Sequence, residues 1–255
     1  MTLLTLRGVT HRRGGRLVLD AVDAGFAAGR LTAVIGPNGA GKSTLLEIAA
    51  GLLRADAGIA ALEGAPIRSI APRTLAAMRA YLPQSPRAEW PVSVERLVAL
   101  GLAQHLPAFG GLPGRWRPAI DAALARFDLT ELRDRPATQL SGGELARAML
   151  ARAVVGDPRL LIVDEPSAGL DPRHAHAAAR QLRSLADGGC AVVAALHDLD
   201  LAARIADDVL ALKDGRVLAN GPADAVLTGP ILSALYDMPV RISGSGSGIS
   251  IRFGD

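Results

Sequence analysis

The sequence predicts an α/β protein, with a mixed β-sheet core, an antiparallel β subdomain and an inserted helical subdomain. Three observations support this prediction. Short β-type runs alternate with helical patterns in residues 31–82 and again in residues 160–220, as is typical of α/β folds. Several β-type runs precede the first helix, which is more strand than a simple doubly wound fold carries. From residue 85 to about residue 153 the chain shows helical patterns and no convincing strand.

The N-terminal part of the chain predicts an antiparallel sheet laid against a parallel core. Its apolar runs are short, and turn signals at Gly14-Gly15 and Ala28-Gly29 separate them. The predicted strands cover residues 3–9, 16–19, 21–26 and 31–35. After a glycine-rich turn we expect a helix at 45–50, a strand at 58–62, a helix at 73–79 and a strand at 80–82.

The rest of the chain divides into a helical region, a return to the core and a tail. Helices are predicted at 92–102, 119–127 and 145–155, with a Pro- and Gly-rich loop at 106–114. The core resumes with strands at 160–163, 191–196, 209–212 and 216–219 and helices at 173–186 and 199–205. Two short helices and two strands, at 240–242 and 249–253, are expected in the tail. We therefore predict a core of residues 1–84 and 154–220, a helical subdomain of residues 85–153 and a C-terminal extension of residues 221–255.

Composition limits the classes of function. Of the 255 residues 49% are hydrophobic and only 3% aromatic, and 28 basic residues against 25 acidic ones leave a net charge of +3. So few aromatic side chains and so little net charge disfavour direct binding of nucleic acid. No apolar run approaches the roughly 18 residues of a membrane helix, and the N-terminus does not resemble a signal peptide. We expect a cytoplasmic protein, in which the single Cys190 is inert core packing.

One stretch carries the strongest chemical signal. Residues 36–44 read GPNGAGKST, follow the predicted strand at 31–35 and precede the predicted helix at 45–50. This is a phosphate-binding loop in its required context, since backbone N–H groups close around phosphate oxygens where no side chain intervenes. Lys42 can reach the β- and γ-phosphates, and the Ser43 hydroxyl can ligate Mg²⁺. The predicted nucleotide contacts in the loop are Asn38, Gly39, Ala40, Gly41, Lys42, Ser43 and Thr44.

Lysine usage supports this assignment. The chain has only two lysines, Lys42 and Lys213, among its 28 basic residues. One of the two, Lys42, stands in the phosphate-binding loop, where a compact ammonium is required rather than a planar guanidinium. We therefore predict that the chain holds a nucleoside triphosphate on a P-loop NTPase core.

Two carboxylates end the apolar strand at residues 160–163. Asp164 is placed to hold Mg²⁺ through water, and Glu165 to polarise the attacking water. Adjacent carboxylates at a strand end can also be surface charge, and taken alone the pair would leave both interpretations open.

The segment Leu140-Ser141-Gly142-Gly143-Glu144 has two interpretations. Ser141 is a plausible N-cap of the helix that follows. A helix start with two glycines is also an anion site. One chain has no use for two such sites around one γ-phosphate, whereas two chains arranged head to tail can each cover the other's nucleotide.

These motifs together resemble the ATP-binding-cassette (ABC) ATPases. GPNGAGKST, LSGGE, LIVDEP, SAGLD at residues 167–171 and His197 occur in the order and spacing of that family, over roughly residues 3–242. The resemblance implies that Gln84 senses Mg²⁺ and signals to a membrane partner. It also implies that residues 167–171 cross a homodimer interface and that His197 contacts the γ-phosphate. It makes Ser141, Gly142, Gly143 and Glu144 nucleotide contacts, and Ser43, Gln84 and Asp164 metal contacts. His174 and His176 match no motif and suggest a solvated helix face.

The family usually stacks the adenine on an aromatic residue shortly after the first strand. Here the corresponding context is Arg12-Arg13-Gly14-Gly15, so Arg13 stands where the aromatic is expected. A guanidinium can stack on a base. We therefore expect Arg13 to be the adenine platform.

Residues 81–84, 92–101 and 220–242 further resemble ATPases of bacterial importers for iron–siderophore complexes, haem or cobalamin. That resemblance implies ATP and Mg²⁺, a second copy of the chain, two permease subunits and, indirectly, a periplasmic binding protein, at the cytoplasmic face of the cell membrane. Importers of zinc or manganese, exporters and cytosolic assembly systems are the alternatives. Trp90 is either an exposed contact for the permease or an ordinary core residue of the helical subdomain.

Overall fold

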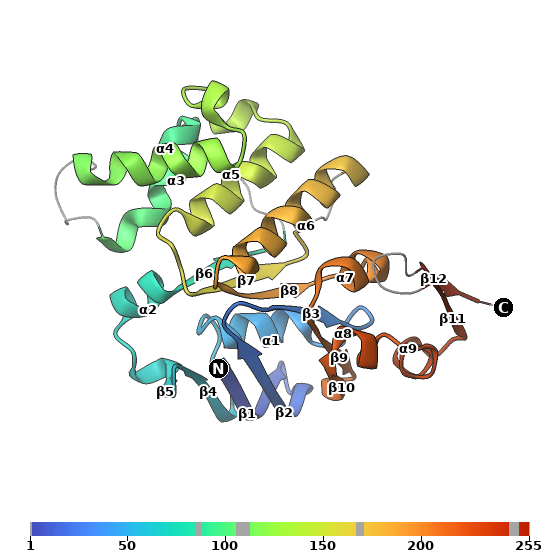
Figure 1. Cartoon of the computed structure of the whole chain (residues 1–255). Coiled ribbons are helices and arrows are strands. Elements are labelled where there is room, and N and C mark those ends of the chain that lie inside the picture. Colours follow the sequence, from blue (N-terminus) through green and yellow to red (C-terminus); the bar gives the residue numbers. More distant parts are fainter. Residues whose placement is uncertain (1, 85–87, 106–112, 167–170, 245–249, 255) are drawn as a thin grey trace.

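The computed structural model describes residues 2–84, 88–105, 113–166, 171–244 and 250–254. A mixed six-stranded sheet lies at its centre, with strand order β10-β9-β3-β8-β7-β6 (Figure 1). All neighbours pair in parallel except β9 and β10, which are antiparallel. The prediction of a mixed sheet is therefore confirmed. Its strands are β3 (Leu31–Ile35), β6 (Arg79–Leu82), β7 (Leu160–Asp164), β8 (Ala191–Ala195), β9 (Asp208–Lys213) and β10 (Arg216–Pro222).

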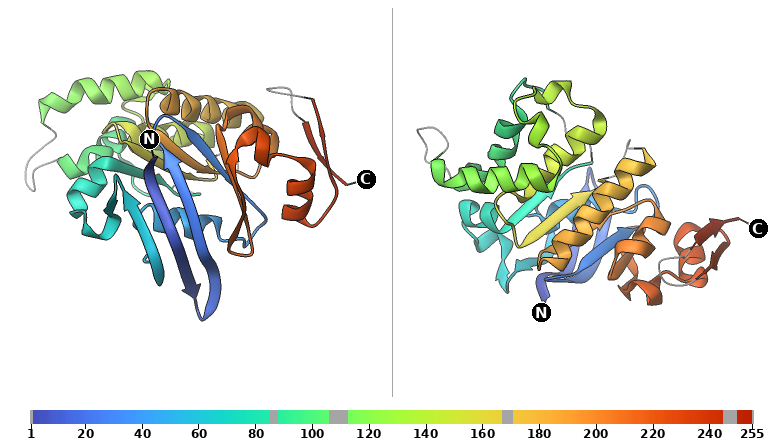
Figure 2. Two further views of the ribbon diagram at one scale, coloured as in Figure 1. Left: turned by 60° about the horizontal axis from the view of Figure 1, so that its bottom comes forward. Right: turned by 45° about the horizontal axis from the view of Figure 1, so that its top comes forward.

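An antiparallel sheet packs beside this core. Its strand order is β2-β1-β4-β5, with strands β1 (Thr2–Arg13), β2 (Arg16–Ala27), β4 (Ala57–Leu62) and β5 (Ala65–Pro66). In the left view of Figure 2 the β1–β2 hairpin (blue) reaches beyond the other elements. The prediction of two separate strands at 16–19 and 21–26 is wrong, because β2 continues through Ala21. That residue adopts a φ of 48°, and its N–H donates to Thr10 Oγ1 at 3.0 Å, so the irregularity is absorbed within the strand.

The alternation of side chains along the central strands creates two cores. Leu161 and Val163 of β7 join a cluster with the helices on one face, whereas Leu160 and Ile162 join a cluster with α1 and the antiparallel sheet on the other. Both faces are covered, so β3, β7 and β8 are buried at every position. The helices packed around the sheet are α1 (Lys42–Ala49), α2 (Pro72–Met78), α6 (Pro172–Asp187) and α7 (Leu199–Ile205).

Between β6 and β7 the described residues form helices and turns, apart from one isolated bridge between Ser93 and Pro136. They comprise α3 (Val94–Ala99), α4 (Arg117–Arg126), α5 (Gly142–Val154) and 3-10 turns at Leu100–His105, Gly114–Trp116, Thr130–Leu132 and Ala137–Gln139. The helix predicted at 92–102 is shorter than expected, because Ser93 caps its start and the chain tightens into a 3-10 turn at Leu100. Trp90 is 75% exposed, so the alternative of a core tryptophan is wrong.

The tail carries α8 (Ala223–Val226), α9 (Gly229–Tyr236) and the two-stranded sheet of β11 (Val240–Ser243) and β12 (Ser250–Phe253). It is tied to α7, because the backbone N–H of Ile251 donates to Asp200 Oδ1 at 2.8 Å. Among the described residues no helix combines the length and apolar character needed to cross a membrane. The division into a core, a helical subdomain and an extension at the predicted boundaries remains a proposal.

Candidate nucleotide-binding and hydrolysis site

The phosphate loop joins the buried strand β3 to α1. Gly36 has a φ of 150°, and a Cβ atom there would lie 2.1 Å from the backbone oxygen of Leu212. Gly41 has a φ of 102°, and its Cβ would lie 2.8 Å from the oxygen of Val18. Because β2 and β9 press this closely on the loop, only glycine fits at both positions. The loop is therefore a backbone cradle at the N-terminus of a helix, where anions are favoured.

Lys42 begins α1 and is 6% exposed. Its Nζ atom donates to the carbonyl oxygens of Gly36 and Pro37, at 2.8 and 3.2 Å. Burial lowers the pKa of the Lys42 ammonium, and the negative charges of Glu165 and Asp164 oppose that shift. The ammonium is thus held over the loop by two carbonyl oxygens, and the charges of two nearby carboxylates stabilise its protonated form.

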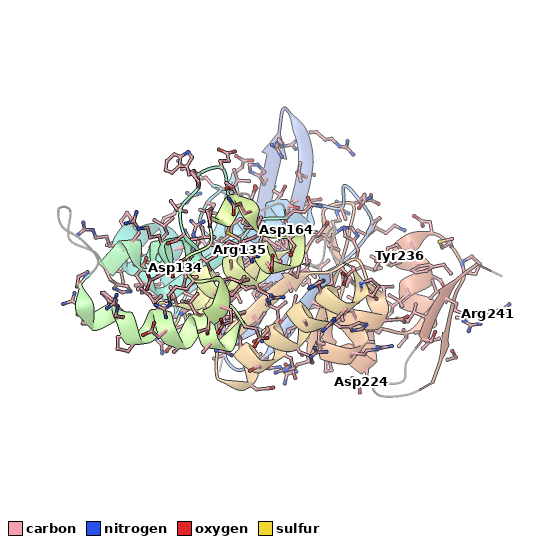
Figure 3. All side chains as sticks on the ribbon, turned by 90° about the horizontal axis from the view of Figure 1, so that it is seen from above. Asp134, Arg135, Asp164, Asp224, Tyr236 and Arg241 are labelled. Atoms are coloured by element: carbon pink, nitrogen blue, oxygen red, sulfur yellow. The ribbon has the colours of Figure 1, made fainter. Side chains whose placement is uncertain are left out.

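Asp164 ends β7 and is 4% exposed, in the middle of the molecule, whereas Arg241 lies at its periphery (Figure 3). Burial raises the pKa of its carboxyl, and the Ser43 hydroxyl partly offsets this. The buried Oδ1 atom finds no hydrogen-bond partner among the described residues. An unsatisfied carboxylate oxygen beside the Ser43 hydroxyl fits a hydrated Mg²⁺, which binds through one or two carboxylates plus phosphate oxygens. The described residues contain no group of three or more His, Cys, Asp or Glu side chains that could hold a metal ion by themselves.

Glu165 lies at the centre of a three-residue network. Gln84 Nε2 donates to its Oε2 atom, and His197 Nε2 pairs with its Oε1 atom. The three residues follow the ends of β6, β7 and β8, three adjacent parallel strands, which brings them together although 81 and 32 residues separate the pairs. Glu165 has a φ of 51°, a strained conformation for a residue with a side chain.

A cavity of about 850 Å³ runs from this network along the phosphate loop. It is lined by Lys42, Ser43, Gln84, Glu165 and His197. Arg13, Arg16 and Leu17 of the β1–β2 hairpin line it too. The sequence-predicted contacts Asn38, Gly39, Gly41 and Thr44 line it as well. Arg13 is exposed, so its guanidinium is accessible from this cavity.

The turn between β9 and β10 also lines the cavity, through Asp214 and Gly215, and no sequence motif pointed to it. The Gly215 N–H donates to the Ala40 oxygen at 3.1 Å, and the Gly215 oxygen accepts from Asp20 N–H at 2.9 Å. Gly215 therefore joins the phosphate loop to the antiparallel sheet. A Cβ atom there would lie 2.4 Å from the Val18 oxygen, so the position requires glycine.

The segment from Ser141 to Glu144 does not line this cavity. Ser141 caps α5: its Oγ accepts from Glu144 N–H at 3.3 Å, and Glu144 Oε2 accepts from Ser141 N–H at 2.8 Å. These hydrogen bonds lower the pKa of Glu144. Ser141 and Gly142 are exposed. The structure confirms the predicted N-cap, and within one chain the segment lies apart from the phosphate-loop cavity.

His174 is half-buried rather than solvated, so that part of the prediction is wrong, whereas His176 is exposed as expected. The His174 ring packs against Gly143, a partner 31 positions earlier that no local pattern reveals. Residues 167–170 lie outside the described part of the chain. Asp171 caps α6 by accepting from His174 N–H at 2.9 Å.

Burial raises the pKa of the Cys190 thiol to about 11, which agrees with inert packing.

A strand, a glycine-rich loop, a lysine at the helix start and a carboxylate pair at the end of β7, which β8 separates from β3, define a phosphate-loop nucleoside triphosphatase. The family described as "ABC transporter" matches residues 19–168. The chain therefore belongs to the ABC transporter family, as an ATP-binding and ATP-hydrolysing subunit.

Relatives and solved structures agree. The chain is 43% identical to the hemin import ATP-binding protein HmuV of Streptomyces coelicolor, over 92% of this chain and 83% of that protein. It is 44% identical to the protein of the same name from Nocardia farcinica, over 94% of this chain and 85% of that protein. Among solved structures, the ADP conformation of an ATP-binding cassette of an ABC transporter superposes with a TM-score of 0.82 at 26% identity, covering 93% of this chain and 99% of that one.

Proposed function

We propose that the chain hydrolyses ATP to drive the uptake of haem, or of a related iron complex, through a membrane permease. The observation that carries this proposal is the likeness to two hemin import ATP-binding proteins at 43% and 44% identity, over more than nine-tenths of the chain. The phosphate loop and the Glu165 network supply the chemistry that such a subunit needs. The chain would sit at the cytoplasmic face of the cell membrane, with a binding protein that delivers the cargo from outside.

We further propose that two copies of the chain form the working unit. Ser141, Gly142 and Gly143 lie outside the cavity of their own chain, at the start of the 13-residue helix α5, where Ser141 and Gly142 are exposed and Gly143 is buried against His174. In a head-to-tail dimer they would cover the γ-phosphate held by the other chain's loop. Each ATP would then lie between the phosphate loop of one chain and this segment of the other.

Mg²⁺ is part of this proposal. Ser43, Asp164 and Gln84 are the residues that would hold it, with Asp164 acting through water. The bound ion would neutralise the charge that develops on the β- and γ-phosphates. Lys42 would add a positive charge at the same phosphates by exchanging its two loop carbonyls for phosphate oxygens.

The network around Glu165 suggests how hydrolysis is controlled. A general base must reach the attacking water, yet both Glu165 oxygens are occupied by Gln84 and His197. We propose that ATP binding releases Glu165 from both partners. Gln84 would then be available to help hold Mg²⁺, His197 would face the γ-phosphate, and Glu165 would orient and polarise the water. The same exchange makes Gln84 report nucleotide state to the permease.

Replacing Arg13 with alanine should weaken ATP binding about two- to fivefold and reduce the preference for ATP over GTP. The reason is the loss of a stacked guanidinium, an interaction of about 0.5–1 kcal/mol at an exposed site. Titration calorimetry with both nucleotides measures the effect. Arg12→Ala is the matched control, because Arg12 donates to the Gly15 oxygen at 3.2 Å in the same hairpin and does not line the cavity. An Arg13 variant with unchanged affinity and selectivity would refute the adenine platform.

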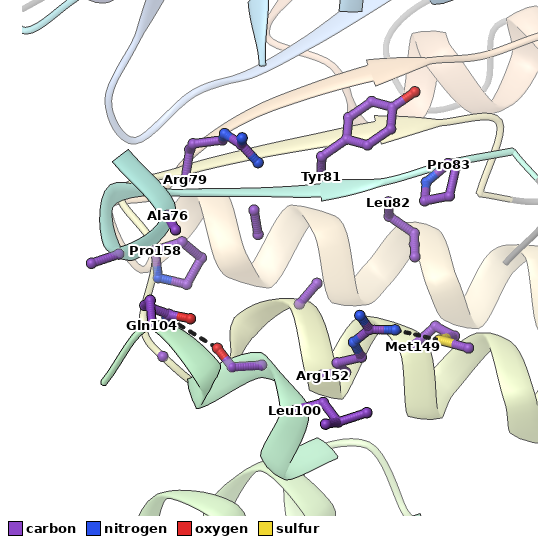
Figure 4. A pocket seen from close by; sticks show the side chains of 15 residues that line it. Ala76, Arg79, Tyr81, Leu82, Pro83, Leu100, Gln104, Met149, Arg152 and Pro158 are labelled. Carbon is purple, nitrogen blue, oxygen red and sulfur yellow. Dashed lines mark hydrogen bonds between the residues drawn. The ribbon is translucent and has the colours of Figure 1, made fainter. Parts of the chain in front are cut away.

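We propose that the permease docks at a second cavity, of about 380 Å³, between β6, α2 and α5. Leu82 and Met149 point into it, and Arg152 lies beside them (Figure 4). Arg152 Nη1 has the Met149 thioether, a weak acceptor, 3.9 Å away. Leu100 on the same cavity is 50% exposed. Apolar side chains beside the exposed Arg152 suit a permease helix that carries an apolar residue and a carboxylate. Pro83 lines the same cavity and is followed directly by Gln84. Docking of the permease there would therefore change the position of Gln84 relative to Glu165.

Haem uptake provides the test of the importer. The chain is reconstituted in proteoliposomes with a haem permease and the matching binding protein, and ATP-dependent accumulation of haem is measured. We expect Arg152→Glu to retain basal ATPase activity and to lose at least 90% of uptake. Arg180→Glu, the same charge reversal at an exposed position of α6, should transport normally. Accumulation of zinc or cobalamin in place of haem would contradict the cargo, and outward transport would contradict the importer.

A further inference from the structure

The contact between His174 and Gly143 links two helix starts. Gly143 is the second residue of α5, and His174 lies in the first turn of α6. A Cβ atom at Gly143 would lie 2.4 Å from Cδ2 and 2.7 Å from Nε2 of the His174 ring. The glycine backbone and the edge of the ring are therefore in direct contact, with no room for a side chain between them.

The His174 ring is fixed by its own helix cap. Asp171 Oδ2 lies 2.8 Å from His174 Nδ1, and Asp171 Oδ1 accepts from the His174 backbone N–H at 2.9 Å. Both hydrogen bonds from His174 lower the pKa of the Asp171 carboxyl, the backbone one most. An ionised carboxylate only accepts, so Nδ1–H donates and the Nε2 edge faces Gly143. One carboxylate thus holds both the backbone and the ring of His174.

We propose that His174 is a positioning residue that sets where Ser141, Gly142 and Gly143 stand for the nucleotide of the partner chain. The His174 ring packs against Gly143 and so supports the start of α5. In the proposed dimer the backbone of Gly143 must approach a phosphate of the partner's nucleotide. A displacement of that backbone by a fraction of an ångström weakens a phosphate contact without changing the loop that binds the rest of the nucleotide. The inference rests on the proposed head-to-tail dimer. His174 of one chain therefore acts on the nucleotide held by the phosphate loop of the other chain.

The first test separates nucleotide binding from dimer closure. His174→Ala is compared with the native chain, each also carrying Glu165→Gln to prevent turnover. We expect the affinity of the single chain for ADP, measured by calorimetry, to stay within twofold. We expect ATP-driven dimerisation, measured by light scattering, to require at least tenfold more ATP. His176→Ala, an exposed histidine of the same helix, is the matched control and should change neither value.

A second variant guards against simple loss of structure. His174→Gln keeps a planar donor near Asp171 and should recover part of the dimerisation lost in His174→Ala. If ADP binding and dimerisation weaken equally, or if dimerisation is unaffected, the inference is overturned. If the Glu165→Gln chain with native His174 forms no ATP-dependent dimer, the proposed function fails instead, and the two failures are distinguishable.

Mixed dimers give the most direct readout. One chain carries Lys42→Ala, so the competent site combines the other chain's loop with Ser141, Gly142 and Gly143 of the Lys42→Ala chain. With Glu165→Gln in both, release of labelled ATP should be at least tenfold faster when His174→Ala is in the Lys42→Ala chain. Release should stay within twofold when His174→Ala is in the other chain. Equal release for both placements would exclude action on the partner's site.

Discussion

Glu165→Gln should reduce ATP turnover by about 10²- to 10⁴-fold, the usual contribution of a general base, while ATP binding stays intact. The substitution keeps the size of the side chain and removes the negative charge that polarises water. Phosphate release measures turnover, and size-exclusion chromatography with ATP measures the dimer. Because bound ATP is no longer consumed, we expect the variant to accumulate as an ATP-bound dimer.

Glu131→Gln is the matched control for this experiment, since it makes the same chemical change at an exposed position of the helical region. It should hydrolyse ATP at the native rate. A Glu165→Gln chain that hydrolysed ATP near the native rate would remove Glu165 from the role of base. His197 would then be the next residue to test, because it pairs with Glu165 in the same network.

Lys42→Ala should weaken ATP binding by about 10- to 150-fold. A hydrogen bond to a charged group contributes about 1.5–3 kcal/mol, and every 1.4 kcal/mol is about tenfold in affinity. The ammonium is buried and already held over the loop by the Gly36 and Pro37 carbonyls, so little has to be ordered when phosphate arrives. Calorimetric titration with ATP in the presence of Mg²⁺ measures the loss.

Lys213→Ala is the control, because it removes the only other lysine of the chain. Lys213 Nζ donates to the Ala234 oxygen and to Asp237 Oδ1, both at 2.5 Å, and so fastens α9 rather than a nucleotide. Its removal should change ATP affinity less than twofold. Thermal unfolding of both variants checks that the fold survives. An unaltered affinity in Lys42→Ala would contradict the role given to the ammonium.

Sequence patterns predicted the elements that carry the site. The apolar runs at residues 31–35 and 160–163 had the composition of strands covered on both faces, and both are fully buried. α7 (Leu199–Ile205) has the predicted bounds. The phosphate loop, the carboxylate pair and the capped segment at Ser141 could each be recognised because their chemistry is local to a few consecutive residues.

Contacts across the sheet could not be predicted in the same way. The occupation of both Glu165 oxygens by Gln84 and His197 depends on strand order, which no single motif encodes. The contact of His174 with Gly143 depends on how two helices pack. The continuity of β2 through Ala21 depends on the hydroxyl of Thr10 in the neighbouring strand. In each case the deciding partner lies far away in the sequence or in another strand.

The double hydrogen bond at Gly215 has a mechanical consequence. It links Ala40 of the phosphate loop to Asp20 of the antiparallel sheet through one residue. The hairpin that bears Arg13 and the loop that bears Lys42 therefore cannot separate without breaking one of these bonds. We expect the hairpin and the phosphate loop to move as one rigid unit. The base and the phosphates of a bound nucleotide would then keep the same spacing in every state of the protein.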